Sequence, residues 1–317
     1  MAEPAASVVI GLSAVIVAAE EDAASVLVAR DPGGALALPS GPFDPVADRT
    51  FELALRAFAR AQTGFEMGYV EQLYTFGDRG RESPRADMGA SAASDARIVS
   101  VGYLALTPNK PAASAGAVWR DWYDFFPWED HRGGRPEMID AAIAPALAAW
   151  AQGARDPDGA AARMRLLFGL DGAPWNEERA LDRYELLYEA GLVAEAARDR
   201  GAAQGLGLGL AMASDHRRIL ATALGRLRAK IKYRPVVFEL MPRAFTLSAL
   251  QRVVEAIVGL TLHKQNFRRA IERTGVLEDA GARTTDTGGR PAALFRVREG
   301  VIRQPAASGI GIPARRG

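Results

Sequence analysis

Cysteine is absent from this chain of 317 residues. Its absence excludes disulfide bonds, thiolate-bound zinc, iron–sulfur clusters and a cysteine nucleophile, and it fits a reducing compartment. Histidine is scarce as well, because His131, His216 and His263 are the only three and lack the spacing of metal ligands. We therefore expect no metal centre, and we expect His216 to make a structural polar contact.

Long apolar runs are also missing. Near the start, the longest run covers residues 7–19 and is shorter than the roughly 20 residues that span a bilayer. No cationic segment precedes it, as a signal peptide would require. Hydrophobic residues make up 49% and charged residues 24% of the chain, which is typical of globular proteins. The sequence thus predicts a cytoplasmic protein without membrane contact, built from two or three domains of about 100–200 residues.

The net charge of +1 conceals a strong asymmetry. Residues 217–317 hold 20 basic and 7 acidic residues, a net charge of +13. Residues 1–216 hold 19 basic and 31 acidic residues, a net charge of −12. This division is typical of an acidic body joined to a basic nucleic-acid-binding module. On charge alone, a solvated basic surface is an equally good interpretation.

The first hundred residues predict a mixed-sheet α/β domain. Alternating, β-branched residues at 8–17 and 25–29 predict a β-hairpin. Apolar residues then recur at helical spacing, with Asp48 or Thr50 as the expected N-cap and Gly64 as the end of the helix. Two further strands are expected at residues 69–76 and 97–106, and an exposed loop is expected between them at residues 77–95.

The middle of the chain is harder to interpret. Residues 119–128 (WRDWYDFFPW) are densely aromatic and fit a packed core by default, with a dimer patch or a ligand wall as alternatives. Helices are expected at residues 138–152 and 176–190. The string GLGLGL at residues 205–210 does not open a βαβ unit followed by an acidic residue, so it predicts a glycine-rich strand and not a dinucleotide site.

The last third has the layout of a winged helix-turn-helix. A long amphipathic helix begins at His216, Thr246 is the expected N-cap of a second helix, and a third helix is expected at residues 263–274. The other expected segments are a strand at 236–239, a wing made of strands at 276–278 and 293–297 around a loop at 284–291, and a disordered tail from residue 305.

The third helix presents polar side chains suited to DNA. Arginine can read guanine, and glutamine or asparagine can read adenine, from the major groove, mainly near the N-terminus of the helix. Further cations suit phosphates. Weighed against an ordinary solvated helix, this pattern and the local charge favour DNA binding. The expected DNA contacts are Arg243, Thr246, Lys264, Gln265, Asn266, Arg268, Arg269, Arg273, Arg283 and Arg290.

The helix that ends at Gly64 resembles the helix of a degenerate Nudix box. That box ends in Arg-Glu-(apolar)-x-Glu-Glu-x-Gly-(apolar). With Gly64 on its last glycine, Ala57 and Phe58 stand in place of Arg-Glu, and Ala61 and Gln62 in place of Glu-Glu. In Nudix hydrolases these carboxylates hold the divalent cations that activate water. We therefore predict that the scaffold is kept and that hydrolysis is lost.

The two halves together resemble the Nudix-related transcriptional regulators of NAD metabolism (NrtR/NadQ-like). The resemblance covers about residues 7–300. It depends on the motifs Asp215-His-Arg-Arg-Ile, Tyr233-x-Pro-x-x-Phe-Glu-Leu-x-Pro-Arg-x-Phe-Thr-Leu, Asn266-Phe-Arg-Arg and Gly289-Arg-Pro, and on Tyr184-Glu-Leu-Leu-Tyr-Glu-Ala-Gly-Leu for the NadQ subgroup.

This resemblance implies an α+β protein, in which a Nudix-like α/β/α sandwich is followed by a C-terminal winged helix-turn-helix domain. It implies a non-enzymatic, homodimeric repressor of NAD-biosynthesis or salvage genes that binds a palindromic double-stranded DNA operator. The implied effector is ADP-ribose, NAD or an ATP-like nucleotide, with no further cofactor required. The expected limits are 1–214 for the Nudix-like domain, including an extra helical segment at about 110–205, then 215–230 for a linker helix, 231–304 for the winged helix domain and 305–317 for the tail.

Arginines and an aromatic ring near the degenerate box suit a nucleotide effector. Cations pair with a diphosphate, and an aromatic ring can stack on adenine. For each arginine taken singly, a surface role is the alternative. The expected effector-site residues are Arg30, Gly41, Phe43, Arg56, Arg60, Arg79 and Arg81.

Two other classes of function stay open. One is an active nucleotide-diphosphate hydrolase that uses carboxylates outside the box, such as Glu52, Glu66 or Glu71, and carries a basic RNA- or protein-binding appendage. The other is an adaptor that binds a partner through residues 119–128.

Overall fold

The core of the protein is a seven-stranded mixed sheet, with the strand order β3-β2-β1-β6-β5 and with β4 added on β1 and β7 on β2. This computed structural model describes residues 8–20, 22–78, 97–110, 112–113, 116–202, 205–285 and 291–298. Most of the loop expected at 77–95 and the tail expected from residue 305 lie outside that range. The strands of this sheet are β1 (Val8–Glu20), β2 (Ala23–Arg30), β3 (Leu36–Ala37), β4 (Ser40–Pro42), β5 (Tyr69–Phe76), β6 (Arg97–Thr107) and β7 (Ala117–Asp121).

Strand β1 is the centre of the sheet. It pairs antiparallel with β2 and parallel with β6, which confirms the predicted hairpin and mixed sheet. Because side chains alternate along a strand, Val15 and Val17 pack into one hydrophobic cluster and Ala14 and Ile16 into another. Both faces of the sheet are therefore covered.

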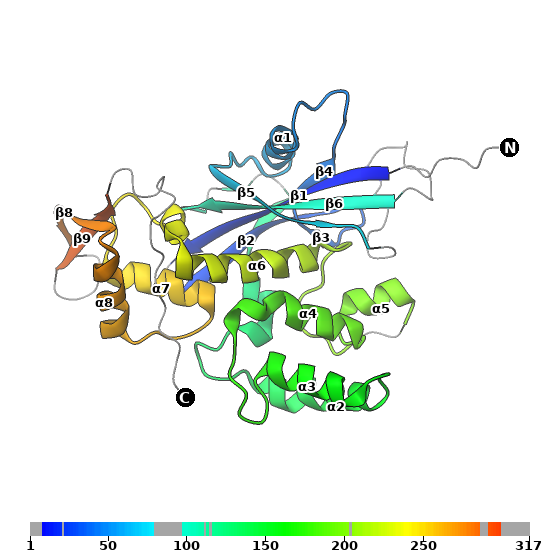
Figure 1. The fold of residues 1–317 in the computed structure, drawn as a ribbon. Helices are drawn as coiled ribbons and strands as arrows, with labels where there is room; N and C mark the ends of the chain where they lie inside the picture. Colours follow the sequence, from blue (N-terminus) through cyan, green and yellow to red (C-terminus); the bar gives the residue numbers. More distant parts are fainter. Residues whose placement is uncertain are drawn as a thin grey trace.

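Helix α1 (Phe51–Thr63) covers one face of the sheet (Figure 1). The Thr50 hydroxyl accepts a hydrogen bond from the Leu53 amide at 3.2 Å, and Gly64 closes the helix with a φ of 71°. Both predicted ends are confirmed. Side chains of Ala54, Leu55 and Ala59 are buried against the strands.

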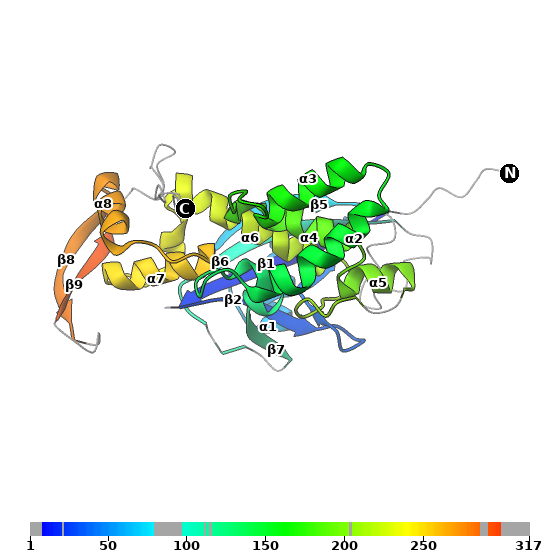
Figure 2. The same ribbon diagram turned by 90° about the horizontal axis from the view of Figure 1, so that it is seen from below.

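Helix α6 covers the opposite face of the sheet, and the middle segment packs onto α6 (Figures 1 and 2). The middle segment therefore does not stand apart from the body. Its aromatic residues 119–128 form core as predicted by default, since Trp122, Phe125 and Trp128 are fully buried. Helix α6 comprises His216–Tyr233. The helices of the middle segment are α2 (Ala144–Gln152), α3 (Pro157–Phe168), α4 (Ala180–Glu189) and α5 (Ala194–Arg200).

The winged helix elements lie at one end of the molecule, at the left in Figure 1. They are α7 (Leu247–Val258), α8 (Lys264–Thr274), β8 (Leu277–Thr284) and β9 (Ala292–Val297). The β8–β9 hairpin is a separate two-stranded sheet, and Phe245 bridges to Phe295 through backbone hydrogen bonds of 3.0 and 2.8 Å. The predicted order of helices and wing strands is confirmed.

Two of the predicted strands are wrong. The segment expected as a strand at 236–239 lies in a 3₁₀ helix, Pro235–Leu240, which places Val237 and Leu240 in the core instead of in a ladder. The string at 205–210 forms no strand, because Gly207 and Gly209 have φ values of 66° and 74° that interrupt extended pairing.

The prediction for His216 is confirmed. Its Nδ1 accepts a hydrogen bond of 3.0 Å from the Leu38 amide in the buried interior. None of the described helices is both long and apolar enough to cross a membrane.

Candidate functional site

Helix α8 presents a continuous polar face to solvent. Phe267 and Ile271 are 2% exposed and anchor the helix on the winged helix core. The outward side chains predicted to contact DNA are all exposed, and none of the cations among them is ion-paired within the described residues. These outward residues are Lys264, Gln265, Asn266, Arg268, Arg269 and Arg273.

The turn that precedes α8 is pinned to α7. The Glu255 carboxylate accepts hydrogen bonds from the Leu262 amide at 2.7 Å and from Gln251 at 3.0 Å, and the Gln251 side chain also donates to the Leu262 carbonyl. Thr246 is 8% exposed, and its hydroxyl caps α7 by accepting from the Ala249 amide at 3.0 Å. The hydroxyl thus serves the helix cap, and its contact with DNA, like those of the other residues, stays a prediction.

The wing and the approach to α7 add further cations. Arg243 and Arg283 are both exposed. Arg296 on β9 forms a cross-strand ion pair of 2.7 Å with Glu278 on β8, which stabilises the hairpin. The predicted contact Arg290 lies outside the described residues.

Much of the excess positive charge of the last third is neutralised by ion pairs with the acidic body. Helix α6 carries six cations, and each pairs with a carboxylate of the acidic body. The pairs are Arg217–Glu195, Arg218–Asp215, Arg226–Glu71, Arg228–Glu129, Lys230–Glu71 and Lys232–Glu177. From Arg234 onward 14 basic and 7 acidic residues remain, a net charge of +7.

The positions of the degenerate box have taken up structural roles. The Phe58 ring lies over β4, so close that a Cβ atom at Gly41 would come within 2.9 Å of it. The Gln62 amide holds the Ser40 backbone, accepting from its N–H at 3.0 Å and donating to its carbonyl at 2.6 Å. Ala61 is exposed. The described residues contain no group of three acidic, histidine or cysteine side chains that could hold a metal ion.

The predicted effector residues do not form one cluster. Phe43 packs edge-on against Phe51 with ring centroids 4.5 Å apart. Arg56 donates to the carbonyls of Met67 and Gly68.

The remaining described effector predictions, Arg60 and Arg30, also make local contacts. Arg60 forms an exposed ion pair of 3.3 Å with Glu66. Arg30 lies at the end of β2 and donates to the Gly34 carbonyl at 2.6 Å. Arg79 and Arg81 lie outside the described residues.

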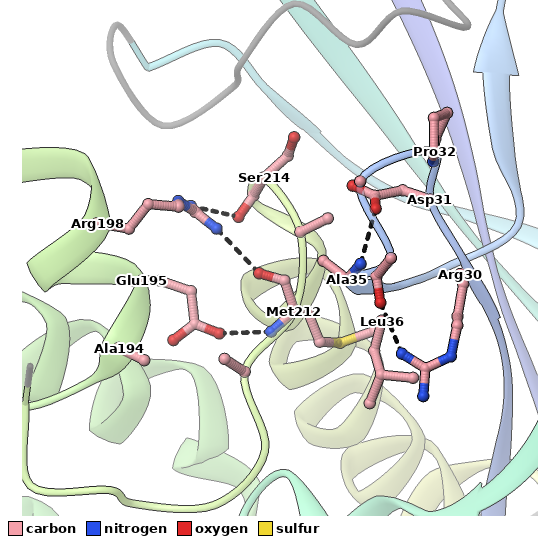
Figure 3. Close-up of a pocket in the computed structure, with 14 residues that line it drawn as sticks. Arg30, Asp31, Pro32, Ala35, Leu36, Ala194, Glu195, Arg198, Met212 and Ser214 are labelled. Atoms are coloured by element: carbon pink, nitrogen blue, oxygen red, sulfur yellow. Dashed lines mark hydrogen bonds between the residues drawn. The ribbon is translucent and has the colours of Figure 1, made fainter.

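Arg30 lines a cavity of about 660 Å³ (Figure 3). The β2–β3 turn forms one wall, and α5 and residues 211–214 form the other. Arg198 donates to the carbonyls of Met212 and Ser214 at 2.9 Å each, and the non-glycine residue Ser214 has a φ of 46°. The cavity volume of about 660 Å³ is in the range of small-molecule sites.

Most residues that line this cavity could not be predicted from the sequence. Arg198 and residues 211–214 are far from Arg30 in the chain, and only the tertiary fold brings them together. The one local signal was Arg30 itself, at the end of a strand before a Pro-Gly-Gly turn.

The three carboxylates considered for hydrolysis are each paired with a cation. Glu52 pairs with Arg56 at 2.9 Å and Glu66 with Arg60. On the opposite face of the sheet, Lys230 and Arg226 bind Glu71. Burial alone would raise the pKa of Glu71, but its bonds to these cations and to Tyr69 hold that pKa below its usual value. These carboxylates do not converge on one site.

Part of the chain is similar in sequence to known proteins. Residues 237–297 match the family model of the NrtR DNA-binding winged helix domain. The ADPR responsive transcriptional repressor NtrR of Acinetobacter baylyi is 40% identical over 89 residues, or 28% of this chain. That match spans only 35% of the length of the relative.

Solved structures resemble nearly the whole chain in fold. Shewanella oneidensis NrtR complexed with a 27mer DNA matches with a TM-score of 0.56 at 19% identity, over 91% of this chain and 93% of that one. A MutT/nudix family protein from Enterococcus faecalis matches with a TM-score of 0.54 at 15% identity, over 94% and 89%. The expected α+β architecture, a Nudix-like domain followed by a winged helix domain, is therefore confirmed. Residues 237–297 therefore match an NrtR-type winged helix domain, and the fold of the whole chain resembles that of NrtR and of the MutT/nudix family protein.

Proposed function

We propose that this protein is a nucleotide-responsive transcriptional repressor that binds double-stranded DNA through α8 and the β8–β9 wing. The observation that carries the proposal is the exposed face of α8, whose cations form no ion pair with any of the described residues. This helix lies within the segment that matches a DNA-binding domain model. Arginine, asparagine and glutamine are the side chains that read base edges, and arginine and lysine also bind phosphates. The genes of NAD biosynthesis or salvage are the proposed targets, from the family resemblance.

The proposed effector is ADP-ribose, since the relative from Acinetobacter baylyi carries that response in its name. The proposed effector site is the cavity beside Arg30 and Arg198. The exposed Arg30 guanidinium makes no ion pair within the described residues, so it is available to a phosphate oxygen. The protein acts as a homodimer on a palindromic operator, so that two copies of α8 meet two half-sites.

This function does not include hydrolysis. The degenerate box offers a phenyl ring and an amide where the metal carboxylates of a Nudix hydrolase stand, and both are engaged in holding β4. Incubation with ADP-ribose and magnesium should release no AMP. Turnover at ordinary enzyme rates that is lost on changing Glu52 or Glu71 would establish the hydrolase instead.

Fluorescence anisotropy tests the proposal directly. The protein should bind a palindrome from upstream of NAD genes more tightly than random duplex, with an affinity that falls as salt rises. ADP-ribose, NAD and ATP are then titrated against the complex. Equal affinity for random duplex would contradict sequence-specific repression.

A matched pair of variants tests the effector site. Arg30→Ala should weaken ADP-ribose binding at least about tenfold, the scale of one charge-assisted hydrogen bond. Arg60→Ala, at the exposed ion pair on the α1 side, should leave it unchanged. The reverse result would place the effector at the degenerate box.

A further inference from the structure

The end of α7 is fastened to the segment at residues 122–131 and to α6. The Tyr123 hydroxyl donates a hydrogen bond of 2.8 Å to the Ala256 carbonyl, and the Arg228 guanidinium donates at 2.9 Å to the Ile257 carbonyl. Both donors are buried. Carbonyls in the last turn of a helix have no partner within the helix, so these two side chains satisfy groups that would otherwise be buried without a partner.

The turn that leads from α7 to α8 is held by the same segment. The His131 amide donates to the Gly259 carbonyl at 2.8 Å, and the Thr261 hydroxyl donates to the Arg132 carbonyl at 3.0 Å. Gly259 has a φ of 71°, and a Cβ atom there would collide with the Glu129 carbonyl. The segment thus lies directly against the turn that orients α8.

A buried ion network fixes the shape of that segment. The Glu129 carboxylate is fully buried and pairs with Arg183 of α4 and Arg228 of α6, at 2.6 Å each. Burial alone would raise the pKa of Glu129, but the two guanidinium groups hold it below its usual value. Removing one member of such a network leaves an uncompensated buried charge, so the network favours one internal shape of the segment.

The other end of the segment reaches the cavity. The Arg217 guanidinium donates to the Phe125 carbonyl at 3.0 Å and pairs with Glu195 at 3.1 Å. The second oxygen of Glu195 accepts from the Met212 amide at 2.9 Å, and Met212 lines the cavity. An uninterrupted series of buried polar contacts therefore runs from the cavity wall to the segment that holds the turn before α8.

We propose that residues 122–131 couple the cavity to α8, and that Tyr123 is a positioning residue for DNA binding. A ligand that displaces Met212 changes the bonds of Glu195 and Arg217, moves the segment, and so alters the orientation of the turn at Gly259. The inference rests on the proposed function, because it requires a nucleotide in the cavity that changes DNA affinity. Coupling is measured as the ratio of DNA affinities without and with the nucleotide.

The test uses two tyrosine variants of the full chain. Tyr123→Phe removes one hydroxyl and keeps the buried ring. Tyr69→Phe is the matched control, since its hydroxyl donates to Glu71 at 2.6 Å and neither residue lines the cavity. ADP-ribose affinity is measured by calorimetry, and DNA affinity by anisotropy with and without ADP-ribose. Tyr123→Phe should keep the ADP-ribose affinity within about twofold and reduce the coupling ratio at least about fivefold, while Tyr69→Phe keeps both.

A second variant protects the test against misfolding of the first. Thr261→Val removes the exposed hydroxyl that contacts Arg132, and it should reduce the coupling ratio in the same direction by a smaller factor. Wild-type coupling in Tyr123→Phe, or in Thr261→Val where Tyr123→Phe does not fold, would overturn this inference alone. A wild-type protein whose DNA affinity ignores every nucleotide would instead overturn the proposed function.

Discussion

The Tyr123 hydroxyl and the Ala256 carbonyl, 133 residues apart in sequence, lie 2.8 Å apart in the buried interior. This bond joins the aromatic segment of the body to the last turn of α7. With the contacts of Arg228 and His131 to the same turn, it docks the winged helix on the body. The orientation of α8 is therefore set by buried contacts and not by a free linker.

Replacing Gly259 by alanine should disrupt this docking. An added Cβ atom would lie 2.8 Å from the Tyr123 hydroxyl and still closer to the Glu129 carbonyl, at a φ of 71°. We expect a loss of more than about 3 kcal/mol in the free energy of unfolding, measured in urea. Gly275→Ala is the control, because its φ is 63° but no atom lies within 4 Å of the new Cβ; it should lose only about 1–2 kcal/mol. Equal losses would show that the contact with the body is unimportant.

Replacing both Arg268 and Arg269 by alanine should abolish specific DNA binding. Both side chains are exposed on α8, so the melting temperature should stay nearly constant. Loss of phosphate contacts also lowers the salt dependence, by about one unit of slope for each contact. Anisotropy at several salt concentrations checks both points.

The control for this double variant is Arg155→Ala, an exposed cation between α2 and α3. It should bind DNA like the wild type. An equal loss of affinity in the control would mean that net charge, and not α8, determines binding.

Local signals predicted much of the fold, and long-range contacts account for what they missed. The caps of α1 at Thr50 and Gly64 could be read from sequence because a cap depends on its immediate neighbours. The segment at 236–239 could not, since its three apolar residues, Val236 to Phe238, fit a buried strand and a buried 3₁₀ helix equally well.

The charge asymmetry, which on its own favoured neither DNA binding nor a solvated surface, has a structural role that the sequence did not reveal. All six cations of α6 pair with the acidic body, so the opposite net charges of the two parts serve partly to join them. Pairs such as Arg228–Glu129, 99 residues apart, leave no local pattern in the sequence.

Restoring the glutamate pair of the box should cost stability without conferring activity. Ala61 is exposed, so Ala61→Glu should change the free energy of unfolding by less than about 0.5 kcal/mol. Gln62→Glu removes the donor to the buried Ser40 carbonyl and should cost about 1–3 kcal/mol. The double variant, incubated with ADP-ribose and magnesium, should release no AMP. Turnover there would show that the scaffold retains the rest of a catalytic site.

Acid should destabilise the protein through His131. Burial, opposed by the charge of Glu129, lowers the pKa of His131 from 6.5 to about 4, and its ring lies 4.0 Å from that of Trp175. Between these two values the unfolded chain binds a proton that the folded chain does not, so the free energy of unfolding falls as the pH drops from about 6.5 to 4. At 1.36 kcal/mol per pKa unit the loss is up to about 3 kcal/mol.

The variant His131→Phe isolates this contribution, because it keeps an aromatic ring on Trp175 and cannot titrate. Urea unfolding of both proteins at pH 8, 6.5, 5.5 and 4.5 gives the difference in their free energies of unfolding, in which ionisable groups remote from His131 cancel. Glu129 interacts with His131, but its pKa is lowered, so its own effect on stability is expected mainly at and below about pH 4.5. The stability of the wild type relative to the variant should be constant above pH 7 and then decline steadily toward pH 4.5. A difference that stays flat across this range would mean that His131 is protonated as readily in the folded protein as in the unfolded chain.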